Sequence, residues 1–184
     1  MHTAFSMEEL GLINYFLGFS VTPFASDYFL SQTKYALEIL SKTGMFDCKP
    51  TPSPMLVKPS SISSPTVAYS NSSLYHNIIG ALQYLTITGP YISFVVNHAC
   101  QTMHSPFETN FASVNHLMRY LKGTIHQGLS FTPGPLELHA FSNSDWGRSV
   151  RDRRSTTGYC VFLGPNLISW SAKKQPTVYR SNRS

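Results

Sequence analysis

Apolar and polar residues follow two different periods along the chain, and the switch between them predicts an α+β fold. Residues 15–21 and 28–31 are apolar runs separated by Pro23 and a polar turn, which predicts a β-hairpin. Residues 32–43 then place apolar side chains three and four positions apart, which predicts a helix that Gly44 ends. The chain is therefore expected to begin with a hairpin and a helix.

A polar connection and three further helices are expected next. Residues 50–73 are rich in Pro, Ser and Thr and show neither period, which predicts a long exposed linker. Apolar stripes with helical spacing then run through residues 74–85, 92–103 and 111–121. Pro90 and Pro106 separate these helices, and Gly123 is expected to cap the last of them.

After Gly128 the period changes to two, which predicts strands. The apolar runs occupy residues 129–131, 136–146, 156–163 and 167–172. Residues 156–163 are apolar on both faces, and this favours an interior strand of the sheet. The pattern therefore predicts an antiparallel sheet at the C-terminal end, with strand edges and one apolar face left exposed.

The charge is unevenly distributed. The sequence is 42% hydrophobic, enough for a packed core, but only 12% of its residues are charged. Residues 145–184 contain eight Lys or Arg and two Asp, whereas residues 1–144 contain six Lys or Arg and seven Asp or Glu. A basic C-terminal end indicates either an anionic partner or simply a solvated tail, and composition does not choose between them.

Several classes of protein are not supported. The three cysteines, Cys48, Cys100 and Cys160, form no Cys-x-x-Cys pair, so a disulfide scaffold, a zinc site and an iron–sulfur site have no support. No signal peptide or apolar run of transmembrane length is visible. We therefore expect a protein that is not secreted and has no membrane partner. An intracellular location is expected, but the sequence does not choose among cytoplasm, nucleus and mitochondrion.

Several motifs, in order along the chain, resemble the Pol polyprotein of copia-type retrotransposons. Segments similar to the end of the reverse transcriptase palm and thumb are residues 16–18, 29–36, 44–50, 79–86 and 119–124. Segments similar to the start of the ribonuclease H domain are residues 153–160 and 168–171. The chain also resembles uncharacterised copia-derived fragments of plant genomes and mitochondria.

The resemblance implies a domain order and names the expected parts of the α+β fold. Residues 1–50 would be the end of the reverse transcriptase palm, a hairpin plus a helix, and residues 51–73 a linker. Residues 74–127 would form a three-helix thumb or connection region. Residues 128–184 would form a truncated ribonuclease H-like domain with an incomplete antiparallel sheet.

The resemblance also implies where catalytic carboxylates should stand. The family's polymerase uses a paired Asp that would lie upstream of residue 1, and this sequence contains no Asp-Asp pair. The family's ribonuclease H begins with an Asp at the position of Asn143, and a later Glu would lie beyond residues 177–181. Asp145 is a weak substitute ligand or, as the simpler alternative, a surface carboxylate. We expect no intact catalytic site and no cofactor in this chain, although the family uses Mg²⁺.

Three hypotheses about function follow. The first is a remnant that by itself is not an enzyme. The second is weak, sequence-independent binding of an RNA–DNA hybrid or other nucleic acid through phosphate contacts. Its candidate residues are Arg119, Lys122, Arg153, Arg154, Lys173 and Lys174, with Arg148 and Arg151 adding to the basic end. The third is an interaction protein that associates with itself or a partner through the exposed sheet.

Overall fold

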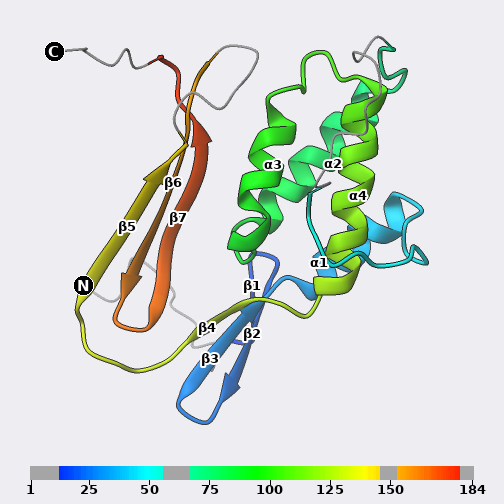
Figure 1. The fold of residues 1–184 in the computed structure, drawn as a ribbon. Coiled ribbons are helices and arrows are strands. Elements are labelled where there is room, and N and C mark those ends of the chain that lie inside the picture. The colour runs from blue at the N-terminus through cyan, green and yellow to red at the C-terminus, as the bar shows by residue number, and fades with distance from the viewer. Residues whose placement is uncertain (1–12, 56–66, 146–152, 179–184) are drawn as a thin grey trace, which may run out of the picture.

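The described part of the chain has two antiparallel sheets and a group of helices, with one sheet beside the helices and the other at one end of them (Figure 1). The computed structural model describes residues 13–55, 67–145 and 153–178. Helices and strands are both abundant in these ranges, so the prediction of a mixed α+β fold is confirmed. Within the predicted linker, residues 56–66 lie outside the described residues.

The first sheet contains the N-terminal hairpin, but its first strand is shorter than predicted. The strands are β1 (Tyr15–Phe16), β2 (Phe19–Phe24), β3 (Asp27–Ser31) and β4 (Leu129–Phe131), in the order β1-β2-β3-β4. The single strand expected over residues 15–21 is wrong, because the chain reverses at Leu17 and Gly18. Both residues have positive φ, 47° and 78°, as tight hairpin turns require.

Strand β4 corrects the expected grouping of the C-terminal strands. Residues 129–131 were expected to belong with the C-terminal sheet, but β4 pairs antiparallel with β3 and closes the first sheet. Gly128 permits this, because a Cβ there would overlap the carbonyl oxygen of Leu30 and lie 2.9 Å from Cζ of Phe29. A period of two predicts a strand but carries no information about its partner.

The helices match the predicted stripes. They are α1 (Thr33–Lys42), α2 (Ser72–Leu85), the short 3₁₀ helix η1 (Pro90–Ile92), α3 (Ser93–Cys100) and α4 (Glu108–Thr124). Gly44 ends α1 as predicted, with φ of 68°. The Gly44 amide donates to the Ser41 carbonyl and the Met45 amide to the Leu40 carbonyl at 2.8 Å, which is a Schellman motif.

Gly123 has a different role from the one predicted. It lies inside α4, which continues to Thr124, so the expected helix cap is wrong. A Cβ at Gly123 would lie 3.3 Å from Cβ of Pro50. The missing side chain therefore lets the segment that follows α1 pass close to α4.

The hydrophobic core is made by the helices. Its most completely buried side chains are Leu40, Tyr75, Ile79, Leu82, Ile92, Val96, Val114, Leu117 and Met118. They come from α1, α2, α3, α4 and η1, and the strands contribute no side chain to this cluster. Most of the apolar stabilisation therefore resides in the helical layer.

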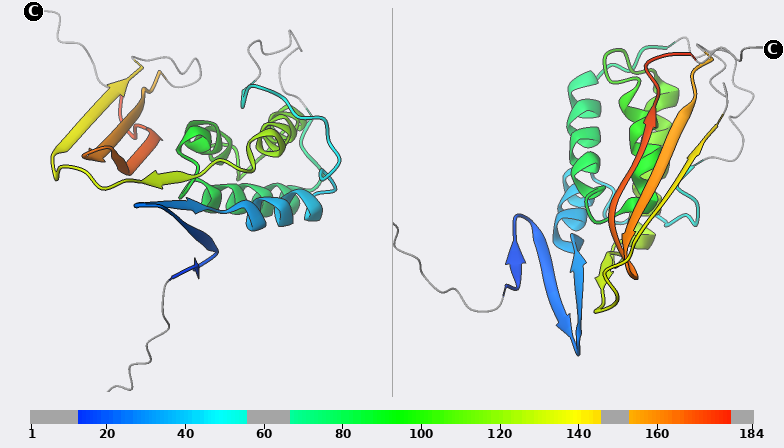
Figure 2. Two further views of the ribbon diagram at one scale, coloured as in Figure 1. Left: turned by 90° about the horizontal axis from the view of Figure 1, so that it is seen from below. Right: turned by 90° about the vertical axis from the view of Figure 1, so that its left-hand side faces the viewer.

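The second sheet consists of β5 (Leu138–Ser144), β6 (Thr156–Leu163) and β7 (Asn166–Lys174), in the order β5-β6-β7. The prediction that residues 156–163 form the interior strand is confirmed. Strand β7 runs beside α3, whereas β5 lies at the outer edge, farthest from the helices (Figures 1 and 2). Every residue of β5 is exposed. The predicted strand end at Trp146 lies outside the described residues.

Trp170 joins the second sheet to the helical layer. Its indole Nε1 donates to the carbonyl oxygen of Thr86, which follows α2, at 3.0 Å. Cross-strand pairing puts Phe141, Cys160 and Trp170 in one row, on the face that turns toward α3.

In the ranges that the structure describes, no helix is long and apolar enough to cross a membrane.

Candidate functional site

The end of β5 is the place where the resemblance predicts catalytic carboxylates. Asn143 lies on β5 opposite Gly158, and its side-chain Oδ1 accepts a hydrogen bond from the Ser144 amide at 2.8 Å. Asp145 follows the strand directly. Its amide donates to the Thr156 carbonyl at 3.1 Å, and its carboxylate accepts from the Thr156 amide. Asp145 therefore fastens the start of β6 to the end of β5.

These residues do not fit the pair of magnesium ions that the resemblance implies. Two-metal chemistry needs several carboxylates around one point. Among the described residues, no group of three or more His, Cys, Asp or Glu is placed to hold a metal. Asn143 carries no charge, and one oxygen of Asp145 already accepts a backbone hydrogen bond. The Asp145 side chain instead stabilises the pairing of β5 with β6 at the end of the strands.

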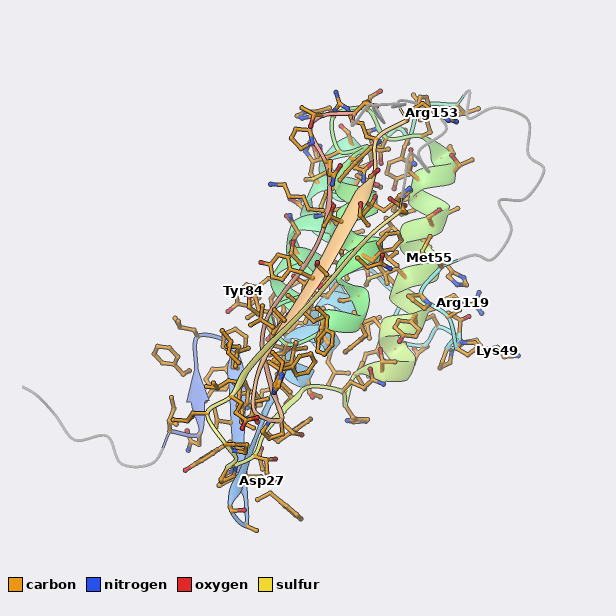
Figure 3. All side chains as sticks on the ribbon, turned by 60° about the vertical axis from the view of Figure 1, so that its left-hand side comes forward. Asp27, Lys49, Met55, Tyr84, Arg119 and Arg153 are labelled. Carbon is orange, nitrogen blue, oxygen red and sulfur yellow. The ribbon has the colours of Figure 1, made fainter. Side chains whose placement is uncertain are left out.

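Four of the six predicted cationic residues gather at the same end of the second sheet. This strand-end cluster consists of Arg153, Arg154, Lys173 and Lys174. Register explains it, because Thr156 pairs with Lys174 and Thr157 with Lys173, so the segment entering β6 lies beside the end of β7. Arg153, Arg154 and Lys173 are exposed. Figure 3 shows Arg153 at this end of the sheet.

Lys174 also acts on the helical layer. Burial lowers the pKa of His98 on α3, and the positive charge of Lys174 lowers this pKa further. His98 is therefore held toward its neutral form near the strand-end cluster. The positive charge at this end of the molecule comes from Lys and Arg and not from His98.

Arg119 and Lys122 lie elsewhere and have a local role. Both are on α4, where Arg119 Nε donates to the Lys49 carbonyl at 2.8 Å. Lys122 Nζ lies 4.3 Å from the ring centroid of Phe46, a cation–π contact. Figure 3 shows Arg119 next to Lys49 and far from Arg153. The six predicted cations thus form two groups, and the α4 pair holds the segment after α1.

The other two cations of the basic end, Arg148 and Arg151, belong to residues 146–152 and lie outside the described residues.

The pattern of the sequence did not indicate an apolar crevice between the helices and the second sheet. It has a volume of about 340 Å³, and its walls include Phe94 of α3 and Phe141, Tyr159 and Trp170 of the sheet. Phe141 is 65% exposed, although it touches Phe162 edge to face. Only the docking of β7 on α3 creates this crevice, so local sequence patterns gave no signal for it.

A second pocket, of about 330 Å³, lies among α2, α3 and α4. Tyr75 is fully buried in its wall, and its hydroxyl donates to the Ala99 carbonyl at 3.0 Å. Burial raises the pKa of Tyr75, so its hydroxyl stays protonated at neutral pH. His98, Asn110 and Ser113 are the other polar residues that line this pocket. The lining has no carboxylate and thus no pair of acid and base.

Comparisons with known proteins find mainly uncharacterised mitochondrial proteins and Pol polyproteins of plant transposons. The chain is 49% identical over 183 residues to an uncharacterised mitochondrial protein of Arabidopsis thaliana, with 99% of the chain and 76% of the relative covered. It is 38% identical over 179 residues to the retrovirus-related Pol polyprotein from transposon RE1 of the same plant, of which the match covers 12%. A retrovirus-related Pol polyprotein from a Nicotiana tabacum transposon is 27% identical, with 95% of this chain and 14% of the relative covered.

The matches cover nearly the whole chain but very different shares of the relatives. The chain spans three quarters of the mitochondrial relative but only a small part of the polyproteins. No family model matches the chain, and no solved structure matches it.

Proposed function

The chain belongs to the family of copia-type retrotransposon Pol polyproteins and their uncharacterised fragments, and from this premise we propose that it is a segment without catalytic activity of its own. In this proposal residues 13–50 correspond to the end of a reverse transcriptase palm. The helices from α2 to α4 correspond to its thumb or connection region. Strands β5, β6 and β7 correspond to the beginning of a ribonuclease H sheet.

The hydrogen bond that Asp145 makes supports the proposal that the chain has no catalytic activity of its own. A catalytic carboxylate must turn its oxygens toward a metal ion, but one oxygen of Asp145 accepts the Thr156 amide. Asn143, at the position where the resemblance expects an Asp, turns its oxygen to the Ser144 amide. The Asp145 side chain thus supports the β5–β6 pair, whereas the Asn143 side chain bonds the next residue of its own strand.

We expect the purified chain not to cleave a labelled RNA–DNA hybrid in the presence of Mg²⁺. Asn143→Asp, which restores the carboxylate, is expected to give no gain, because a single pair of carboxylates cannot clamp two ions. Asp145→Ala is expected to lower the free energy of unfolding by about 1–3 kcal/mol, because it removes the acceptor of the Thr156 amide. Thermal unfolding measures this effect.

Asp145→Ala protein purified in parallel controls for a contaminating nuclease. Cleavage that needs Mg²⁺, appears with the natural chain and disappears with Asp145→Ala would contradict the proposal. Equal cleavage by both proteins would be assigned to the contaminant.

A second candidate function is sequence-independent binding of nucleic acid by the strand-end cluster. Four cations converge on one end of the sheet, within a segment that carries most of the chain's positive charge. Such a cluster binds phosphates and does not read bases. An RNA–DNA hybrid is the first probe, because the relatives are Pol polyproteins.

We expect the binding of a labelled hybrid to weaken steeply with salt. If all four residues of the cluster contact phosphates, the logarithm of the association constant should fall with the logarithm of salt concentration with a slope of about −3 to −4. Replacing Arg153 and Lys173 by Ala together should make this slope shallower by about 2. Fluorescence anisotropy at several salt concentrations measures both slopes.

The matched control replaces Arg119 and Lys122 by Ala and removes the same charge. The α4 pair contacts Lys49 and Phe46, so this variant should keep the slope of the natural chain. Undetectable binding at low salt, or an equal change in both double variants, would remove the strand-end cluster as the binding surface.

A further inference from the structure

We propose that the outer edge of β5 is a self-complementary surface that pairs with β5 of a second copy of this chain, giving a continuous sheet across a twofold axis. The proposal does not depend on nucleic-acid binding. It rests on the direction of the backbone groups of β5, on the residues that β5 carries, and on the symmetry of one particular register.

Two backbone hydrogen bonds at the ends of β5 determine which of its backbone groups face outward. The Asp145 amide donates to the Thr156 carbonyl at 3.1 Å, and the Gly164 amide donates to the Glu137 carbonyl at 2.7 Å. In an antiparallel ladder the bonded residues alternate, and the β5–β6 register runs without a shift. Odd-numbered residues therefore bond to β6. The amides and carbonyls of Leu138, Ala140 and Ser142 point away from the sheet.

No described strand covers this edge. The sheet order is β5-β6-β7, and β7, at the other edge, is the strand that contacts α3 and β4. At one point the edge is already occupied, because the outward amide of Ser144 donates to Asn143 Oδ1. The remaining outward groups form a row that a second strand can extend.

The side chains of β5 do not oppose self-pairing. Natural edge strands avoid unwanted pairing with charged residues or Pro, but Leu138–Ser144 contains no Lys, Arg, Asp, Glu or Pro. Its apolar residues are strongly exposed, with Leu138 at 67% and Phe141 at 65%. Pairing would cover such surface without bringing like charges together, although the whole chain has a net charge of +5.

A register centred on Phe141 lets the outward-facing backbone groups of the two copies meet and brings no like charges together. In this antiparallel register every residue of β5 lies opposite a residue of β5 of the second copy, because Phe141 is the middle residue of the strand. Ala140 lies opposite Ser142, so outward-facing groups meet outward-facing groups. Phe141 lies opposite Phe141 of the second copy in a non-hydrogen-bonded pair, where side chains approach most closely. An interface of this kind is isologous and closes as a dimer.

The experiment measures the mass of the full chain by sedimentation velocity over a range of concentrations. A reducing agent is present because Cys48, Cys100 and Cys160 are free. We expect a reversible monomer–dimer equilibrium. Phe141→Lys should abolish the dimer because like charges would meet on the axis. Leu136→Lys is the matched control, since Leu136 is 85% exposed but lies outside β5, and it should leave the dimer intact.

Two further measurements test the edge and the register. A mixture of Phe141→Lys and Phe141→Glu should recover the dimer, because only this register brings the two side chains together. In the natural chain, the amides of Ala140 and Ser142 should exchange hydrogen more slowly as concentration rises. Ser142→Pro should prevent dimer formation while leaving the β5–β6 pair intact, because that amide faces outward.

Several results would contradict the pairing of β5 with a second copy or the register centred on Phe141. A monomer at every concentration overturns the proposal. So does a dimer that Phe141→Lys leaves unchanged, or exchange at Ala140 and Ser142 that does not depend on concentration. If the Lys and Glu variants each lose the dimer but fail to recover it when mixed, the register centred on Phe141 is wrong.

Discussion

Replacing Leu82 by Ala is expected to lower the free energy of unfolding by about 2–5 kcal/mol. Leu82 is fully buried on α2, within the core that the helices share. The substitution removes apolar burial and leaves a cavity that the neighbouring helices fill only in part. The total free energy of unfolding of an ordinary domain is about 5–15 kcal/mol, so this substitution would remove a large part of the stability.

Urea denaturation followed by circular dichroism measures the effect. The control is Leu136→Ala, which removes the same side chain from a position that is 85% exposed. It should change the free energy by no more than about 0.5 kcal/mol. Equal effects of the two substitutions would show that the helical core does not carry the stability of the chain.

Replacing Gly128 by Ala is expected to lower the free energy of unfolding by about 3 kcal/mol or more, because the new Cβ meets backbone. It would overlap the Leu30 carbonyl oxygen and lie 3.1 Å from the carbonyl carbon of the same residue. Neither atom belongs to a flexible side chain, so β3 or β4 must move. Loss of the β3–β4 pairing should appear as faster amide exchange in both strands.

Gly80→Ala is the matched control and should have the opposite sign. Gly80 lies within α2, and a Cβ there would meet nothing within 4 Å. Ala is the better helix former by about 1 kcal/mol, so this variant should be stabilised by about that amount. A destabilised Gly80→Ala, or an unaffected Gly128→Ala, would contradict the described backbone.

The helices were predictable because their signals are local. Apolar spacing located α1, α2, α3 and α4, and Gly44 at the end of α1 has the positive φ that its sequence position indicated. The interior position of β6 was predictable for a similar reason, since apolar residues on both faces are typical of strands in the middle of a sheet.

The corrections concern contacts between segments that are far apart in sequence. Gly123 looked like a helix cap, but it provides space for Pro50. The strand at residues 129–131 was predicted, but pairing with β3 depends on the path of the whole helical layer. Likewise, Leu17 has the backbone conformation of a turn inside an apolar run that locally favours an unbroken strand.

The sequence named six cationic residues as candidates but did not show how they would group. The pairing of β6 with β7 decided that Arg153, Arg154, Lys173 and Lys174 would meet. The contacts of Arg119 with Lys49 and of Lys122 with Phe46 depend on how the segment after α1 crosses α4. Spacing along α4 alone could not reveal those contacts.

The pairing of β3 with β4 has a consequence for the order of events during synthesis. Residues 27–31 leave the ribosome early, but their partner strand at residues 129–131 follows only after the helices have been made. The edge of β3 must therefore wait for a distant contact, which has a large entropic cost of closure and forms slowly. A chain released between α4 and β4 would keep its helical core but expose the edge of β3 to other nascent chains.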